Sequence, residues 1–213
     1  MRIYSIFTSI DGEVNGWGQG GFSTFIRFAG CNLRCKYCDT TYAQGGFSGK
    51  EMSVTEILVR IESRGCKKLT ITGGEPLFQL PGLEELVHYL SRYDITLETN
   101  GSFFVPNWLS GRNIVMDYKL ESSGQTVKMN LDNFKGLKKT DFVKFVVKDR
   151  VDYDQAKKVM EKVGGYSPVK FAFSPCYETM EGKKLVDWLI EDKLFDCIVN
   201  VQIHKCLGLV EDK

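Results

Sequence analysis

The stretch Cys31-Asn32-Leu33-Arg34-Cys35-Lys36-Tyr37-Cys38-Asp39-Thr40 decides both the fold and the chemistry, and it follows the strand-like run Phe25-Ile26-Arg27-Phe28. Its three cysteines have a C-x3-C-x2-C spacing. A cluster of four irons and four sulfides has four iron corners that thiolates can bind, so three cysteines leave one iron open. An open coordination position distinguishes a catalytic metal site from a closed structural one. The spacing therefore predicts a catalytic cluster bound by Cys31, Cys35 and Cys38.

A structural zinc site, an electron-transfer cluster and a disulfide are the alternatives. Zinc normally needs a fourth protein ligand, commonly from a second C-x2-C pair, and the sequence has no such pair. A cluster that only transfers electrons usually has four thiolate ligands. The motif alone favours the catalytic cluster and leaves these alternatives open to metal analysis.

The composition limits the partners and the compartment. The chain has 28 Lys+Arg against 27 Asp+Glu, a net charge of +1, so its overall charge gives no attraction to nucleic acid or to an anionic membrane. Three of the seven cysteines lie within eight residues, and the N-terminus lacks the apolar region of a signal peptide. We therefore expect a cytoplasmic protein in a reducing compartment, without a membrane span. Its 213 residues fit a single domain over residues 1–213.

Strand and helix signals alternate along the chain. Ser53-Val54-Thr55-Glu56 is a capping box that begins a helix before Gly65. After the strand at 22–28, we expect strands at 68–72, 95–99, 114–117, 142–147, 169–174 and 197–201, and helices near 83–90, 153–163 and 183–192. This alternation predicts an α/β fold, a partial (β/α) barrel of about six mainly parallel strands, too few for a full eight-stranded barrel.

Candidate site residues follow the ends of the expected strands. Gly73-Gly74-Glu75-Pro76, Thr99-Asn100-Gly101 and Tyr118-Lys119 each lie just after a strand, as the cysteine stretch does. Because ligands of parallel α/β folds bind at the carboxyl ends of the strands, these segments should meet at one rim. The segment Asp11–Gly21 has five glycines and is expected to fold over a ligand.

Several of these residues have both a structural and a functional interpretation. Arg27 fits a surface arginine on an edge strand as well as a clamp for a carboxylate. Asp39-Thr40 fits a turn cap better than a Mg²⁺ ligand on the sequence alone. Gly73-Gly74 fits a tight turn, but its position favours close approach of a ligand. His204 has a better claim to function than His88, which lies on a polar helix face.

The combined motifs resemble the radical S-adenosylmethionine superfamily. The resemblance rests on the three cysteines, on Tyr37 before the last of them, and on Gly73-Gly74-Glu75-Pro76 after the next strand. More narrowly, the chain is similar to the 7-carboxy-7-deazaguanine synthases over most of its length. The segments that carry this similarity are Ile10-Asp11-Gly12-Glu13, Phe25 to Cys31, Cys38-Asp39-Thr40, Thr72 to Pro76, Glu98-Thr99-Asn100-Gly101 and Gln202-Ile203-His204-Lys205.

The resemblance implies a shortened radical S-adenosylmethionine core and a ring-contracting activity. S-adenosylmethionine would chelate the open iron of a 4Fe-4S cluster, and one electron would release a 5'-deoxyadenosyl radical. In this family the radical takes hydrogen from C6 of 6-carboxy-5,6,7,8-tetrahydropterin, and ammonia leaves as 7-carboxy-7-deazaguanine forms on the route to queuosine-type deazapurines. The chain would then be a carbon–nitrogen lyase. An activating enzyme that makes a glycyl radical on a protein partner shares the cysteine spacing and remains the alternative within the superfamily.

The resemblance also implies roles for individual residues. It assigns cofactor binding to Gly74, Glu98, Asp117, Tyr118 and Lys119, and substrate binding to Ile10, Asp11, Gly12, Glu13, Arg27, Thr72, Gln202 and His204. Thr40 would bind Mg²⁺ that bridges to the substrate carboxylate. Many members carry Gln in place of Asp11 and Ser-Pro-Lys in place of Asp117-Tyr118-Lys119. A flavodoxin-like or ferredoxin-like reductant and a homodimer are further expectations of the family.

Overall fold

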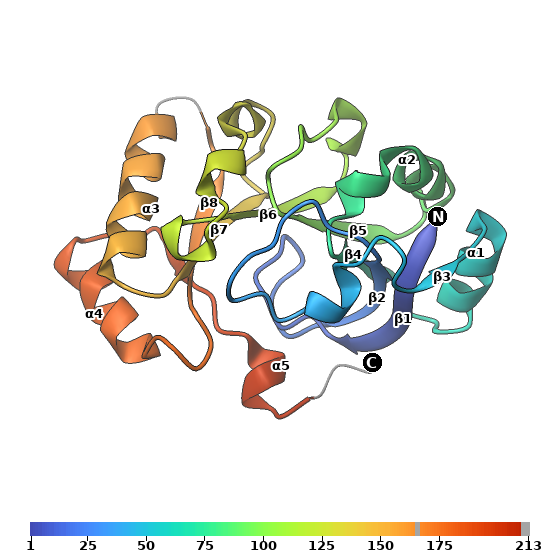
Figure 1. Ribbon diagram of the computed structural model, residues 1–213, viewed down its shortest axis with the longest axis horizontal. Coiled ribbons are helices and arrows are strands. Elements are labelled where there is room, and N and C mark those ends of the chain that lie inside the picture. The colour runs from blue at the N-terminus through green and yellow to red at the C-terminus, as the bar shows by residue number, and fades with distance from the viewer. Residues whose placement is uncertain (165–166, 210–213) are drawn as a thin grey trace.

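The computed structural model describes residues 1–164 and 167–209 and contains one sheet of nine strands in the order β3-β1-β2-β4-β5-β6-β7-β8-β9 (Figure 1). The strands are β1 (Arg2–Ile10), β2 (Phe22–Phe28), β3 (Lys50–Glu51), β4 (Lys68–Gly73), β5 (Asp94–Thr99), β6 (Asn113–Tyr118), β7 (Phe142–Val147), β8 (Lys170–Pro175) and β9 (Ile198–Val199). Each neighbouring pair from β2 to β9 is parallel, whereas β1 is antiparallel to β2 and to β3.

The predicted α/β fold with a mainly parallel sheet is confirmed, with one more parallel strand than the six expected. The strand expected at 22–28 is β2, and it joins the parallel set because it pairs with β4 from Thr24 and Leu69 to Phe28 and Gly73. Among the described residues β3 and β9 stay at the two edges of the sheet without pairing with each other. The sheet is therefore a partial barrel, open between these edges.

Helices cover the outer face of this sheet. They are α1 (Val54–Glu62), α2 (Leu80–Tyr89), α3 (Arg150–Val163) and α4 (Gly182–Glu191), and a short helix, α5 (Ile203–Cys206), lies apart from them near the end of the described chain (Figure 1). The predicted capping box is confirmed, because the Glu56 amide donates to Ser53 Oγ at 3.2 Å and Glu56 Oε2 accepts from the Ser53 amide at 2.8 Å. No helix of residues 1–164 and 167–209 is long and apolar enough to cross a membrane.

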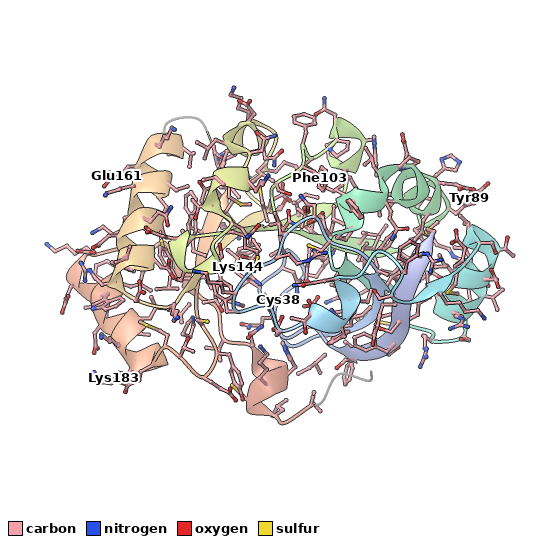
Figure 2. The ribbon with its side chains drawn as sticks, viewed as in Figure 1. Cys38, Tyr89, Phe103, Lys144, Glu161 and Lys183 are labelled. Carbon is pink, nitrogen blue, oxygen red and sulfur yellow. The ribbon has the colours of Figure 1, made fainter. Side chains whose placement is uncertain are left out.

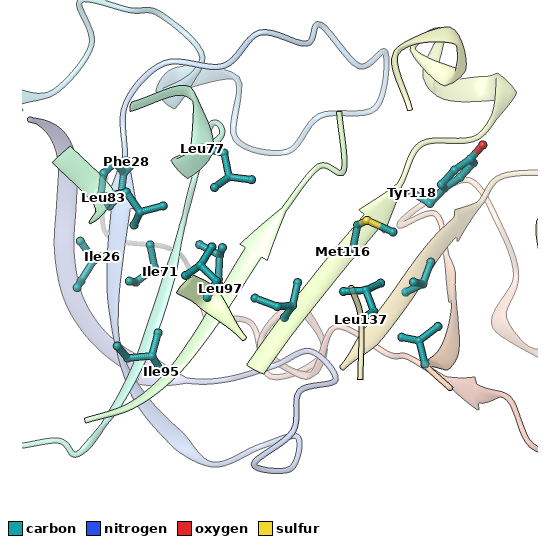
Figure 3. Packing of buried hydrophobic residues seen from close by; sticks show 14 of the residues in the cluster. Ile26, Phe28, Ile71, Leu77, Leu83, Ile95, Leu97, Met116, Tyr118 and Leu137 are labelled. Atoms are coloured by element: carbon teal, nitrogen blue, oxygen red, sulfur yellow. The ribbon is translucent and has the colours of Figure 1, made fainter. Parts of the chain in front are cut away.

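Side chains alternate between the two faces of each strand, and this alternation divides core from cavity. The outward side chains of the central strands, such as Ile26, Ile71, Leu97 and Met116, pack into the hydrophobic core beneath the helices (Figure 3). The inward side chains include a series of polar and charged groups, namely Arg27, Thr72, Glu98, Asp117 and Lys144. The curved sheet therefore buries an apolar outer face and presents a polar inner face to a cavity.

The glycine-rich segment after β1, which the sequence predicts to fold over a ligand, borders the cavity with Asp11, Gly12 and Glu13 and then runs beneath the sheet. Lys68 at the start of β4 donates to the Trp17 carbonyl, and a Cβ at Gly16 would lie 2.1 Å from the side chain of Asn113 at the start of β6. Both contacts lie at the amino-terminal ends of parallel strands. The segment thus closes the floor of the barrel, opposite the cysteine stretch.

Candidate active site

A cavity of about 770 Å³ occupies the inner face of the sheet. It brings together the three cysteines and every other predicted site residue except Tyr118. The members are Ile10, Asp11, Gly12, Glu13, Arg27, Cys31, Cys35, Cys38, Thr40, Thr72, Gly74, Glu98, Asp117, Lys119, Gln202 and His204. The expectation that strand-end segments converge on one rim is confirmed.

The cysteine stretch is held over the cavity by backbone and side-chain hydrogen bonds. The amides of Gly30 and Cys31 donate to the carbonyls of Ala43 and Gln44 at 2.7 and 3.1 Å. Asn100 Nδ2 and the Leu33 amide approach Cys31 Sγ at 3.7 and 3.4 Å. Donors aimed at a sulfur stabilise its thiolate form, which is the form that binds metal.

Glu75, which the sequence analysis left without a role, ties two rim segments together. Its carboxylate is buried and accepts hydrogen bonds from the Asn100 amide at 2.6 Å, Thr99 Oγ1 at 2.8 Å and the Leu77 amide at 3.0 Å. Burial raises the pKa of Glu75 to about 7, although these donors oppose the rise. Because Asn100 also contacts Cys31, Glu75 fixes the rim segment that supports the first cysteine.

The glycine pair at the end of β4 has a packing role that the sequence analysis had set below ligand approach. Gly73 has φ +141, and a Cβ there would lie 2.2 Å from the Phe28 carbonyl oxygen. A Cβ at Gly74 would lie 2.3 Å from the Gly30 carbonyl oxygen and 2.9 Å from Cys31 Cβ. Gly74 also lines the cavity. The missing side chains therefore allow β4 to approach the cysteine stretch closely.

The cysteine geometry fits a multi-iron cluster better than a single ion. Within residues 1–164 and 167–209, no three His, Cys, Asp or Glu side chains are arranged to hold one metal ion. A zinc site requires four ligands around one ion. In an iron–sulfur cluster each cysteine binds a different iron, so the thiolates need not converge on one point. The three half-buried cysteines all border the cavity and are free of disulfides, as cluster ligands must be.

Arg27 lies on the inner face of β2, and the interpretation of a surface arginine is wrong. β2 is flanked by β1 and β4, and Arg27 is only 4% exposed. Its guanidinium carbon lies 5.6 Å from the centre of the Phe7 ring and 5.8 Å from that of Tyr42. The two rings orient a buried cation beside the cavity.

Two carboxyl groups in the cavity have raised pKa values. Glu98 Oε2 accepts from Thr72 Oγ1 at 2.7 Å, and burial together with the charges of Glu13 and Asp11 raises the pKa of Glu98 to about 8. Burial also raises the pKa of Asp11 to about 6, although its Oδ2 accepts from Thr70 Oγ1 at 2.8 Å. These carboxyl groups change charge near neutral pH, a property that is frequent in functional sites.

Lys144 on β7 is a cavity residue that the sequence analysis missed. Its ammonium pairs with Glu13 and lies 3.4 Å from Asp117 Oδ2, while Lys119 Nζ lies 2.9 Å from the same oxygen. Burial disfavours the charges of both lysines, but the neighbouring carboxylates raise their pKa values above the usual range. Figure 2 labels Lys144 and Cys38, which both line the cavity in the centre of the molecule.

The segment around α5 closes one side of the cavity. The Ile203 amide donates to the Gly12 carbonyl at 3.1 Å, and a Cβ at Gly12 would lie 2.3 Å from His204 Nδ1, so glycine at this position permits the contact. Lys205 Nζ donates to Asp39 Oδ2 at 2.7 Å, which connects this segment to the cysteine stretch. The C-terminal segment and the cysteine stretch therefore meet across the cavity.

Thr40 does not cap a turn with its side chain, although the sequence favoured that interpretation. It precedes the short helical turn Thr41–Ala43 without a side-chain capping bond. Its hydroxyl lies 3.6 Å from Cys38 Sγ and borders the cavity. The hydroxyl is therefore available beside the third cysteine as an oxygen ligand.

Tyr118 is the predicted site residue whose side chain does not reach the cavity. It lies in the hydrophobic core, with ring centres 6.1 Å from Phe134 and 5.9 Å from Phe145 (Figure 3). The reason is strand alternation: Asp117 and Lys119 point inward, so Tyr118 between them points outward. A cofactor-binding role for the Tyr118 side chain is therefore withdrawn.

Known proteins share both the sequence and the fold of this chain. The Radical SAM superfamily model matches residues 25–188. Proteins named 7-carboxy-7-deazaguanine synthase match almost the whole chain: that of Clostridium acetobutylicum is 38% identical, covering 97% of this chain and 95% of its own, and that of Methanospirillum hungatei is 36% identical, covering 98% and 86%.

A solved structure supports the fold independently. The crystal structure of QueE from Escherichia coli has a TM-score of 0.74 to this chain, covering 94% of this chain and 93% of that one, at 19% sequence identity. At this identity the likeness concerns the fold. This likeness of fold and the full-length sequence matches agree with the observed cavity, in which the three cysteines lie at the carboxyl ends of parallel strands. The chain belongs to the 7-carboxy-7-deazaguanine synthase family of the radical S-adenosylmethionine superfamily.

Proposed function

We propose that this enzyme converts 6-carboxy-5,6,7,8-tetrahydropterin to 7-carboxy-7-deazaguanine with loss of ammonia, as a carbon–nitrogen lyase of deazapurine biosynthesis. The observation that carries the proposal is the shared cavity, in which three cysteines lie with a buried arginine and several carboxyl groups. A small acid with many N–H donors matches this lining. The names of the full-length relatives support the same reaction.

Cys31, Cys35 and Cys38 are the residues that would hold a 4Fe-4S cluster, with Gly74, Glu98, Asp117 and Lys119 lining the region for S-adenosylmethionine. When bound, these two groups supply the one-electron chemistry that abstracts hydrogen from the substrate. Gly74 lets the cysteine stretch lie close to this region, because a Cβ there would collide with the Gly30 carbonyl and Cys31 Cβ. Asp117 presents one carboxylate oxygen, Oδ1, that has no hydrogen-bond partner among the described residues.

On the substrate side, Arg27 would bind the carboxylate in a bidentate manner, since a planar guanidinium matches carboxylate geometry. Ile10, Gly12 and His204 border the same space. Acceptors for the ring N–H groups would come from Asp11 and Glu13. Thr72 borders the substrate side and donates to Glu98 of the cofactor side. Gln202 donates to Glu13 at 2.8 Å and so orients that acceptor.

Thr40 would complete the site as a Mg²⁺ ligand that bridges to the substrate carboxylate. Mg²⁺ keeps several waters and needs few protein ligands, so one hydroxyl beside the cavity is a sufficient anchor. The floor closed by residues 11–21 and the side closed by α5 limit the access of water, which protects radical chemistry from side reactions. A flavodoxin-like or ferredoxin-like reductant, a homodimer and a cytoplasmic location complete the proposal.

An activity assay tests this function. Protein reconstituted with iron and sulfide without oxygen, then given dithionite, S-adenosylmethionine, Mg²⁺ and the carboxytetrahydropterin, should release ammonia and the deazaguanine acid. The control is the same protein with Cys31, Cys35 and Cys38 changed to alanine. Formation of 5'-deoxyadenosine with the pterin returned unchanged would retain the superfamily chemistry and refute the substrate.

A further inference from the structure

A continuous chain of polar contacts crosses the inner face of the sheet. Gln202 Nε2 donates to Glu13 Oε1 at 2.8 Å, and Glu13 Oε2 pairs with the ammonium of Lys144. Lys144 Nζ also lies 3.4 Å from Asp117 Oδ2, and Lys119 Nζ lies 2.9 Å from that oxygen. Lys144 is therefore the central member of a chain of five side chains.

Under the proposed function, the two halves of this series of five side chains contact different ligands. Glu13 and Gln202 form the substrate half, and Asp117 and Lys119 form the cofactor half. We propose that Lys144 is a positioning residue that connects the substrate half to the cofactor half by holding Glu13 and Asp117 at the same time. This inference rests on the proposed function, since that function assigns the two halves to two ligands.

The position of Lys144 in the sheet explains why it can serve both halves. It lies on β7, next to Asp117 of β6 in the parallel register, and it is 8% exposed. An ammonium has three donors, so one lysine can bind two carboxylates. With Lys119 it occupies Oδ2 of Asp117, which leaves Oδ1 as the oxygen for a ligand.

The charged surroundings of Lys144 come from several elements. Glu13 faces it from the segment after β1, Glu98 from β5, and Asp117 and Lys119 from β6 and the residue that follows it. Asp39 of the cysteine stretch also interacts with its charge, although Asp39 pairs directly with Lys205. The neighbouring strand β8 contributes the uncharged Ala172 opposite Lys144. Removing the ammonium would leave Glu13 near the other carboxyl groups without their shared cation.

The effect of removing the Lys144 ammonium should differ from the effect of removing a side chain of either half. A carboxylate left in the cavity without its cation is favoured in its protonated form and repels its neighbours when ionised. Lys144→Met should therefore disturb Glu13 and Asp117 together. Lys119→Met, in contrast, removes a contact of Asp117 and leaves the pair of Lys144 with Glu13 in place.

Equilibrium binding to the reconstituted protein tests this difference. Lys144→Met should raise the Kd of both the pterin and S-adenosylmethionine by about tenfold or more, because charged hydrogen bonds are affected on both sides. Lys119→Met should raise the Kd of S-adenosylmethionine with a smaller effect on the pterin. Lys144→Arg, which keeps a cation, should recover part of both affinities. An effect of Lys144→Met on one ligand alone would overturn the proposal.

A second measurement uses the protein without cluster or ligands. Thermal unfolding of Lys144→Met should show a larger loss relative to wild type at about pH 8.5 than at about pH 6, because protonation at low pH relieves the unpaired carboxylates. An equal loss at both pH values would indicate a packing role and refute the inference. If the wild type fails to convert the pterin, the proposed function is refuted. If the wild type turns over normally and Lys144→Met loses the same thermal stability at both pH values, only the role of Lys144 is refuted.

Discussion

Arg27 offers the sharpest test of how this cavity recognises a substrate. Its guanidinium is buried on β2 between the rings of Phe7 and Tyr42 and borders the cavity. Arg27→Met keeps an unbranched apolar stem that can pack against the rings and removes the charge. If Arg27 binds the substrate carboxylate, this variant should lose substrate affinity and retain cofactor affinity.

The expected magnitude follows from the contacts. Two hydrogen bonds between charged groups contribute about 1.5 kcal/mol each at the lower end of the usual range, or about 3 kcal/mol together. A loss of about 3 kcal/mol raises the Kd of the pterin by about a hundredfold or more, since each 1.4 kcal/mol is a factor of ten. The two ring contacts, at about 1 kcal/mol each, predict a lower stability of about 2 kcal/mol.

Isothermal titration of the pterin and of S-adenosylmethionine into reconstituted protein measures both affinities. Arg27→Lys, which keeps the charge without the fork geometry, should lie between wild type and Arg27→Met. Phe7→Leu is the matched control, because it removes a ring contact of Arg27 and the stacking of Phe7 on Phe25 at 5.1 Å but keeps the guanidinium. Equal losses for both ligands in Arg27→Met, or a pterin loss as large in Phe7→Leu, would refute the carboxylate role.

Three further outcomes are expected. Because the pKa of Glu98 rises from 4.5 to about 8 on folding, the folded protein binds an extra proton between these pH values and loses stability as the pH rises through them. The Glu98→Gln variant should therefore unfold at a higher temperature than wild type at about pH 9 and at a similar temperature at about pH 4.5. A difference that does not change with pH would contradict this expectation. Thr40→Val should abolish stimulation of turnover by Mg²⁺ while leaving the Kd of S-adenosylmethionine within about threefold, and unchanged stimulation would exclude Thr40 as the ligand. Gly74→Ala should displace Cys31, cost about 1–3 kcal/mol in unfolding free energy and lower the iron bound per chain, and wild-type iron content would count against the packing role.

Strand periodicity explains both the success and the errors of the sequence analysis. The convergence of strand-end segments was predictable, because parallel strands place their carboxyl ends at one edge. The same alternation, applied residue by residue, would have excluded Tyr118, which lies between the inward residues Asp117 and Lys119. It would also have identified Lys144, a lysine in the otherwise apolar strand Phe142–Val147. A buried charge in such a strand needs a partner, and that need was the missed signal.

Other features could not be derived from the sequence, because they depend on contacts between distant segments. The glycines of residues 11–21 indicate a loop but not which end of the barrel it covers; its contacts with Lys68 and Asn113 decide that. Glu75 belongs to a motif that suggests cofactor binding, yet its carboxylate accepts hydrogen bonds from Thr99 at the end of β5, from the Asn100 amide and from the Leu77 amide. The pairing of Lys205 with Asp39 joins residues 166 positions apart, and no local pattern indicates it.

The division of the sheet into an apolar outer face and a charged inner face has an energetic consequence for ligand binding. The outer face supplies the hydrophobic core, whereas the inner face buries carboxyl groups, of which Glu98 keeps its proton near neutral pH. Burying such groups costs stability unless partners compensate for lost water. Ligands that donate N–H groups to these carboxyl groups and accept from Arg27 would add further polar partners on the inner face. Because such ligands bind the folded state alone, they should stabilise it, so the buried charges of the inner face favour a small, charged, N–H-rich substrate.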